Sequence, residues 1–355
     1  MQYRNLGKTG IETSVIGLGT YPIGGWMWGG TDEADSIRTI QACLEMGINL
    51  IDTAPMYGYG LAEEIVGKAI KGRRDKAIVA TKCGVVWDTE DWPTGKGEFH
   101  FYADDKGLTA QKTKYSFYRY LKPESIIREV ETSLKRLGTD YIDLLQTHAQ
   151  ENTTPIEETM TALEKLREQG KIRAIGCSNV TKEQLTRYCG AGTLDSTQER
   201  YSYLDRLSEE NGVLGACRTN QVSFIAYSPL EHGLLTGTLD PNFDYPDGDF
   251  RKTDKRFSRD NVDKTNKMLA KLQPLADRHS FSISQLMLAW TVSKYEKLHI
   301  ICGMRNVREV TENAQAGKVL LATEEIQEIE ATVDRSLFDA EIPQVAHSSY
   351  LYFSL

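Results

Sequence analysis

The sequence predicts an α/β fold, a (β/α)8 TIM barrel with an N-terminal β-hairpin plug and long loops at the C-terminal face. Eight short apolar segments alternate with segments whose apolar residues recur at helical spacing. Doubly wound sheets usually stop at about five or six strands, so the longer repeat favours the barrel. The 355 residues suit one enlarged barrel, which we expect to form a single domain over 1–355 with a tail over 338–355.

The expected strands are apolar runs that stop at a glycine or a polar residue. They cover residues 15–19, 48–52, 77–82, 141–145, 172–177, 196–198, 222–227 and 299–301. The opening residues 1–14 place glycines between two short alternating runs, which predicts a hairpin that plugs the opposite end of the barrel.

The expected helices carry apolar stripes at helical spacing, and several end at a glycine. They cover residues 32–46, 61–71, 124–137, 155–170, a segment that begins after 181, 209–219, 283–293, 307–317 and 323–337. Two of them begin with capping boxes, Thr154 with Glu157 and Thr181 with Gln184.

Two stretches, 85–121 and 231–264, do not fit the repeat, and each follows a strand. Loops of this length are usually functional lids or disordered insertions, and the aromatic content of the first favours a lid.

Charge and composition exclude several classes of function. The net charge of −8 is spread without long runs of one sign, which argues against nucleic-acid and membrane partners. No apolar stretch approaches the roughly 20 residues of a membrane span, and the first residues do not begin a signal peptide, so we expect a cytoplasmic protein. The six cysteines have no CxxC spacing and are expected to be reduced core residues, with no metal site.

Polar residues interrupt the apolar strands at their carboxyl ends, which open on one face of a parallel barrel. They are Asp52, Lys82, His148, Ser178 with Asn179, Gln198, Tyr227 and Gly303. Any one of them could instead be a cap, a surface partner or a core residue. Burying such groups unpaired costs about 2–7 kcal/mol each, so their recurrence at one place predicts a functional site.

Six motifs in order resemble the aldo-keto reductases from about Tyr3 to Leu337. They are Gly17-Leu18-Gly19-Thr20, Ile51-Asp52-Thr53-Ala54 with Tyr57-Gly58, Ala80-Thr81-Lys82, Tyr141-Ile142-Asp143-Leu144 with His148, the run 170–176 with Ser178-Asn179, and the run 226–230. The segment 233–237 resembles bacterial members with an extended nucleotide loop. A Rossmann site is disfavoured because Gly17-Leu18-Gly19 lacks the third glycine of its fingerprint.

The resemblance implies a catalytic set of Asp52, Tyr57, Lys82 and His148. Tyr57 would give a proton to the carbonyl oxygen as hydride reaches the carbon. Lys82 would favour the phenolate, Asp52 would hold Lys82 charged, and His148 would direct the carbonyl.

The resemblance also implies an NADPH or NADP+ site, with NADH or NAD+ as the alternative. The nicotinamide would lie on Tyr227, with its carboxamide at Ser178, Asn179 and Gln198. Gly19, Thr20, Tyr21 and Asp52 are further expected cofactor-binding residues. The pyrophosphate would follow Ser228, Pro229, Leu230, Gly233, Leu235 and Gly237, and the adenosine end would meet Gly303, Met304, Arg305, Glu309, Glu312 and Asn313, with Arg256 a second cation. Arg305 opens a helix and favours NADPH, whereas Glu309 opposes it; we expect Arg305 to prevail.

The expected function is NADP(H)-dependent reduction of a sugar-like or polyol-derived carbonyl. Its pocket would be walled by Tyr21, Trp26, Trp28, Trp87 and Gln150. Three alternatives stay open: an NAD-linked dehydrogenase, a nucleotide-binding regulator of a membrane partner with slow turnover, and an unrelated barrel enzyme acting on phosphates. The oligomeric state is left open.

Overall fold

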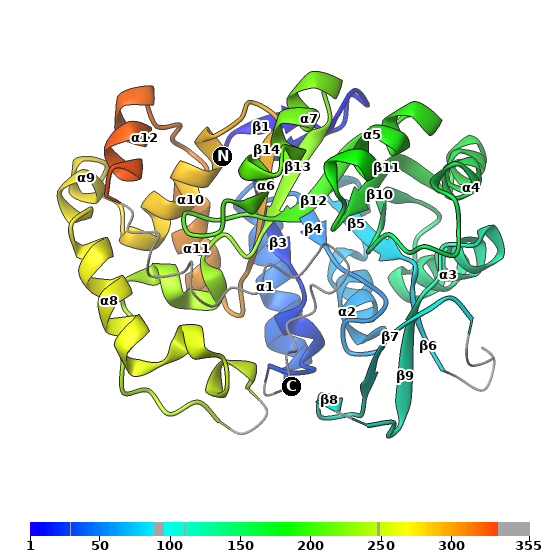
Figure 1. Ribbon diagram of the computed structural model, residues 1–355, viewed down its shortest axis with the longest axis horizontal. Helices are drawn as coiled ribbons and strands as arrows, with labels where there is room; N and C mark the ends of the chain where they lie inside the picture. The colour runs from blue at the N-terminus through cyan, green and yellow to red at the C-terminus, as the bar shows by residue number, and fades with distance from the viewer. Residues whose placement is uncertain (29, 89–95, 110, 247–248, 333–355) are drawn as a thin grey trace.

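Eight parallel strands close into a barrel in the computed structural model (Figure 1), which confirms the predicted (β/α)8 fold. The structure describes residues 1–28, 30–88, 96–109, 111–246 and 249–332. Around the barrel the strands follow the order β3 (Ile16–Gly19), β4 (Leu50–Asp52), β5 (Ile78–Cys83), β10 (Ile142–Thr147), β11 (Ile172–Ser178), β12 (Ser196–Arg200), β13 (Ser223–Tyr227) and β14 (Leu298–Gly303).

The helices surround the strands, and the main core lies between the two layers. They are α1 (Glu33–Glu45), α2 (Leu61–Ile70), α3 (Pro123–Leu137), α4 (Ile156–Glu168), α5 (Lys182–Ala191), α6 (Leu207–Glu210), α7 (Val213–Asn220), α8 (Arg259–Ala270), α9 (Gln273–Arg278), α10 (Ile283–Ser293), α11 (Val307–Ala316) and α12 (Thr323–Glu330). No helix within the described ranges is long and apolar enough to cross a membrane. Five of the six cysteines are buried free thiols, and Cys189 is half-buried.

The helix boundaries correct three predictions. The capping box at Thr181 is present, but the one at Thr154 is wrong, because Pro155 is the N-cap of α4 and offers no side-chain acceptor. Gly212, with a φ of 81°, divides the predicted helix 209–219 into α6 and α7. The last predicted helix, 323–337, corresponds to α12, which ends at Glu330. The predicted helical residues from 333 on, and the predicted tail, lie outside the described ranges.

The N-terminal hairpin is present as predicted and closes the barrel end remote from the strand carboxyl ends. Strands β1 (Tyr3–Asn5) and β2 (Glu12–Ser14) pair antiparallel. Between them, Leu6 and Ile11 are buried against inward apolar side chains of the barrel strands. The plug therefore leaves only the opposite end of the barrel open to ligands.

The stretch 85–121 is more regular than the sequence indicated. Its described part forms an antiparallel sheet in the order β6 (Val85–Trp87), β9 (Tyr115–Arg119), β7 (Glu98–Ala103) and β8 (Leu108–Thr109). The sheet extends beyond the barrel at the end opposite the hairpin (Figure 1). The second long stretch contains the short 3₁₀ helices η3 (Glu231–Thr236), η4 (Phe250–Lys252) and η5 (Lys255–Phe257) before α8.

Candidate functional site

A buried ion pair forms the centre of the open barrel end. Asp52 ends β4, Lys82 lies near the end of the neighbouring β5, and each is 1% exposed. Lys82 Nζ donates to Asp52 Oδ1 at 2.6 Å. The second oxygen, Asp52 Oδ2, accepts from Gln198 Nε2 at 2.8 Å and from Gln146 Nε2 at 3.3 Å. Both carboxylate oxygens are therefore held from other strands of the barrel.

The same ammonium group connects the ion pair to Tyr57. Lys82 Nζ also donates to the carbonyl oxygen of Thr53 at 3.0 Å and to Tyr57 Oη at 3.3 Å. An ammonium has three hydrogens, so these contacts use all of its donors. Because Tyr57 Oη accepts from Lys82, its own O–H remains available for a group in the barrel mouth.

The loop that carries Tyr57 is held by a close backbone approach. A Cβ on Gly58, where φ is +63°, would lie 2.3 Å from the carbonyl oxygen of Gly24. A Cβ on Gly24 would in turn lie 2.8 Å from the carbonyl carbon of Tyr57. The two glycines therefore allow the loop after β4 to rest against the loop after β3.

Burial controls the ionisation of the catalytic candidates. It raises the pKa of Tyr57 well above its ordinary value, and the carboxylate of Asp52 adds to the increase. Burial lowers the pKa of Lys82, although Asp52 opposes that shift. Tyr57 is therefore a neutral phenol before reaction, and the expectation that Lys82 favours the phenolate stays a prediction.

His148 completes the set from the end of β10. Its ring meets that of Tyr57 edge to face, with centroids 6.0 Å apart. Burial and the nearby charge of Lys82 hold the pKa of His148 well below its ordinary value. The imidazole is thus neutral at physiological pH and can both donate and accept hydrogen bonds.

An interlinked group of polar side chains continues the site toward β13. Asn179, with a left-handed φ of 56°, donates from Nδ2 to the carbonyl oxygen of His148 at 2.9 Å. Its Oδ1 accepts from Tyr227 Oη, also at 2.9 Å. Ser178 Oγ donates to the carbonyl oxygen of Gln198 at 2.7 Å. The residues expected at the nicotinamide therefore lie together and are fixed by one another.

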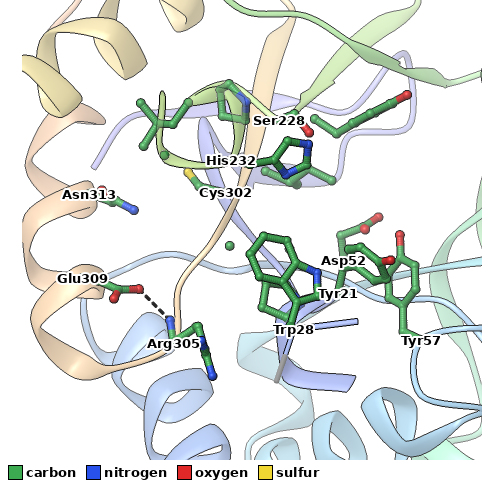
Figure 2. A pocket seen from close by; sticks show the side chains of 18 of the residues that line it. Tyr21, Trp28, Asp52, Tyr57, Ser228, His232, Cys302, Arg305, Glu309 and Asn313 are labelled. Carbon is green, nitrogen blue, oxygen red and sulfur yellow. Dashed lines mark hydrogen bonds between the residues drawn. The ribbon is translucent and has the colours of Figure 1, made fainter. Parts of the chain in front are cut away.

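A cavity of about 460 Å³ runs from this group to the start of α11 (Figure 2). It is lined by these residues from the predicted site: Gly19, Tyr21, Trp28, Asp52, Tyr57, His148, Ser178, Asn179, Gln198, Tyr227, Ser228, Pro229, Leu230, Gly233, Gly303, Arg305, Glu309, Glu312 and Asn313. Lys82 does not line the cavity but lies directly behind Tyr57 and Asp52.

Several predicted site residues do not line this cavity. Buried Arg256 pairs instead with Glu231 at 3.2 Å and with Asp254, so it is not a second cation for the adenosine end. The side chain of Gln150 turns inward, where it accepts from Tyr188 Oη at 2.6 Å. The other six also lie outside the lining: Trp26 and Trp87, which pack on Phe117, together with Thr20, Leu235, Gly237 and Met304.

Other lining residues were missed by the sequence reading. They are Pro22, Met27, His232, Thr236, Phe250, Arg251, Ser284, Ile301 and Cys302. Gln146, which does not line the cavity but donates to Asp52, was also missed, although its position two residues before His148 indicates the same inward direction. The missed residues of η3 and η4 carried no comparable signal, because their loop has no period.

A carboxylate of α11 itself, that of Glu309, accepts hydrogen bonds from the residues just before the helix. Glu309 Oε2 accepts from the backbone N–H of Arg305 at 2.8 Å, and Oε1 accepts from Asn306 Nδ2 at 2.7 Å. The guanidinium of Arg305 lies apart from Glu309 in Figure 2 and donates to the carbonyl oxygen of Gly30 at 3.4 Å. Glu309 was expected to neutralise the Arg305 guanidinium or to repel a 2′-phosphate. It instead accepts from the backbone N–H of Arg305, while the guanidinium contacts Gly30.

The cavity fits a nicotinamide dinucleotide by the chemistry of its lining. One end offers amide and hydroxyl groups with the ring of Tyr227, as a carboxamide-bearing ring requires. The other end offers the start of α11. Gly233 lies in the lining between the two ends, and a Cβ added to it would contact only Leu239, at 4.0 Å. Within the described ranges, no group of three His, Cys, Asp or Glu side chains could hold a metal ion.

Comparison with known proteins agrees with this reading. The family model described as "Aldo/keto reductase family" matches residues 15–334. The NADH-specific methylglyoxal reductase of Escherichia coli is 41% identical over 341 residues, covering 94% of this chain and 98% of that protein. Aldo-keto reductase YhdN of Bacillus subtilis is 36% identical over 347 residues, covering 97% of each. The structure of the glycerol dehydrogenase AKR11B4 from Gluconobacter oxydans is 32% identical with a TM-score of 0.82, covering 96% of this chain and 98% of that one.

The Gly58 contact predicts a stability and activity defect in Gly58→Ala. Alanine would be strained at a φ of +63° by about 1–2 kcal/mol and would also collide with Gly24, so thermal unfolding should show a larger loss. Gly72→Ala is the matched control, because Gly72 has a φ of +76° with nothing within 4 Å. Equal stability losses in the two variants would show that the close approach does not hold the Tyr57 loop.

Proposed function

The chain belongs to the aldo/keto reductase family, and we propose that it reduces small carbonyl compounds with NADH, with Tyr57 as the proton donor. Members of this family are oxidoreductases that act on carbonyl compounds with NAD(P)H. The observation that carries the proposal is the hydrogen-bonded series from Asp52 through Lys82 to Tyr57, which opens into the cavity.

The proposed reaction divides between the cofactor and three side chains. When bound, the reduced nicotinamide supplies a hydride to the carbonyl carbon. Tyr57 Oη gives its proton to the carbonyl oxygen as negative charge develops there. The phenolate that remains lies 3.3 Å from Lys82 Nζ, whose positive charge stabilises it. Asp52 keeps that ammonium charged and in place despite its burial.

His148 is suited to orient the carbonyl rather than to protonate it. Its pKa is lowered well below the ordinary value, so the imidazolium is scarce at neutral pH. A neutral ring can still donate one N–H to the carbonyl oxygen next to Tyr57. The two rings therefore offer two donors on the same side of the mouth, with the proton itself coming from Tyr57.

The substrate class we propose is a three-carbon carbonyl related to polyols. The walls near Tyr57 are aromatic, with Tyr21 5.0 Å from it between ring centroids and Trp28 6.0 Å from Tyr21. Gln150, which would have made a polar wall for a longer sugar, faces away. The named substrates of two relatives, methylglyoxal and glycerol, both have three carbons with oxygens on adjacent carbons.

The choice of NADH follows from Glu309. A 2′-phosphate at the start of α11 would seek the backbone N–H of Arg305, but the Glu309 carboxylate already accepts from it. A second negative charge there would be repelled, whereas the 2′-hydroxyl of NADH could donate to a carboxylate. The sequence alone favoured NADPH through Arg305; the position of Glu309 is what favours NADH.

Tyr57→Phe tests the reaction. Turnover of methylglyoxal or hydroxyacetone with NADH should fall by about 10²–10⁴, as expected for loss of a general acid, while the Kd for NADH changes only a few-fold. Tyr59→Phe is the control, because Tyr59 Oη donates to the carbonyl oxygen of Asp104 at 2.8 Å and does not line the cavity. A near-normal kcat in Tyr57→Phe would remove Tyr57 from the mechanism, and wild-type protein that reduces no small carbonyl would refute the function.

Glu309→Gln tests the cofactor choice. Removing the charge should raise NADPH affinity relative to NADH by about one to two decades, the range of a charge-assisted contact of about 1.5–3 kcal/mol. Glu324→Gln removes a similar charge from the first turn of α12 and should leave the ratio unchanged. Fluorescence titrations at equal ionic strength give both constants. Wild type that binds NADPH more tightly than NADH would contradict the assignment.

A further inference from the structure

The turn that follows β13 has an unusual backbone. Ser228, Glu231 and His232 have φ values of 55°, 47° and 55°, and Gly233 has a φ of 102°. Residues with a Cβ rarely adopt this left-handed region, so three of them in five positions require support from the surrounding structure. Strained backbone of this kind is concentrated at ligand-binding segments.

The support is a buried carboxylate within the turn itself. Glu231 is 3% exposed and pairs with the guanidinium of Arg200, which lies at the end of β12. Arg256 Nη1 donates to Glu231 Oε2 at 3.2 Å from η5, later in the same long loop. Ser202 Oγ donates to Glu231 Oε1 at 2.7 Å. Three separate segments are thus tied to one side chain.

Glu231 does not line the cavity, but its neighbours on both sides do. Ser228, Pro229, Leu230, His232 and Gly233 all belong to the lining. Figure 2 shows Ser228 and His232 at the upper edge of the cavity, between the Tyr57 end and the start of α11. Any influence of Glu231 on a ligand therefore passes through the conformation of the turn.

We propose that Glu231 is a positioning residue: it holds the turn 228–233, with its left-handed residues Ser228, Glu231, His232 and Gly233, against the diphosphate of the cofactor. The proposal rests on the proposed function, because the ligand is the same NADH. It assigns to the ion pairs with Arg200 and Arg256 the task of keeping the diphosphate segment formed before the ligand arrives. A preformed segment binds more tightly, because the ligand need not order it.

A change in the local electrostatic field would not explain weaker NADH binding after Glu231 is neutralised. Arg200 also pairs with Asp205 at 3.1 Å, and Arg256 also pairs with Asp254. Both guanidinium groups therefore keep a carboxylate when Glu231 is neutralised. Loss of one negative charge alone should, if anything, attract a diphosphate more strongly. Weaker binding after neutralisation would consequently report the loss of the turn's conformation.

The test is NADH binding to Glu231→Gln, measured by fluorescence titration, with Asp143→Asn as the matched control. Asp143 is a buried carboxylate that also pairs with two arginines, Arg74 at 2.6 Å and Arg173 at 2.7 Å, but it lies near the start of β10 and not in the cavity lining. We expect the Kd for NADH to rise about tenfold or more in Glu231→Gln, because misplacement of a ligand-binding segment weakens binding. In Asp143→Asn the Kd should stay within about twofold, because a loss of stability at a remote site does not alter the ligand contacts.

Ser202→Ala is a second variant that keeps every charge. It removes the hydrogen bond to Glu231, together with the acceptor that Ser202 Oγ offers to the backbone N–H groups of Leu204 at 3.2 Å and Asp205 at 2.9 Å. It should raise the Kd by a smaller factor in the same direction, and it provides the test if Glu231→Gln does not fold. In turnover, KM for NADH should rise while kcat changes little, since Glu231 does not line the cavity and acts through the turn 228–233, not through Tyr57.

An unchanged Kd in Glu231→Gln, or in Ser202→Ala if that is the folded variant, overturns the proposal. Equal increases in Glu231→Gln and Asp143→Asn also overturn it, because they would reflect general destabilisation. Wild type that binds NADH but reduces no carbonyl would refute the proposed function and leave this test intact. Wild type that does not bind NADH refutes both.

Discussion

The buried contact between Lys82 and Asp52 is the interaction on which the site depends. Removing each ion from water costs several kcal/mol, so the pair is tolerable only because both partners are fully hydrogen-bonded. The side chains that bind Asp52 come from different strands, and in the barrel register Gln146 of β10 lies beside Lys82 of β5. A slip of one residue in any of these strands would turn its polar side chain away from the barrel interior. The barrel thus fixes the ion pair, and the ion pair fixes Tyr57.

Three carboxylates perform related tasks along the cavity. Asp52 accepts from Lys82 beside the Tyr57 hydroxyl, Glu231 ties together the segments around a strained turn, and Glu309 accepts from the backbone N–H of Arg305 just before α11. In each place the carboxylate is matched to donors of the chain itself. Under the proposed function, the cofactor would therefore meet groups that are already held in position, which favours binding because the ligand need not order them.

The sequence predicted the barrel and the strand ends well, because both follow from local periodicity. Asp52, Lys82 and His148 were identifiable as polar residues that end apolar runs. The loops were harder, since the direction of a loop side chain depends on partners far away in the sequence. Gln150 turns toward Tyr188, and Arg256 turns toward Glu231, so neither lines the cavity as expected. The sheet formed by β6 to β9 was missed because its aromatic strands are separated by irregular segments.

The ionisation of Tyr57 tests this account most directly. A spectroscopic pH titration of tyrosinate absorbance, taken as wild type minus Tyr57→Phe, isolates this one phenol. Because burial and Asp52 raise its pKa well above the ordinary value of 10.0, the difference should show no tyrosinate at or below pH 10. A phenol that ionises near neutral pH in wild type, and is missing in Tyr57→Phe, would contradict the claim that a neutral Tyr57 held by Lys82 is the proton donor.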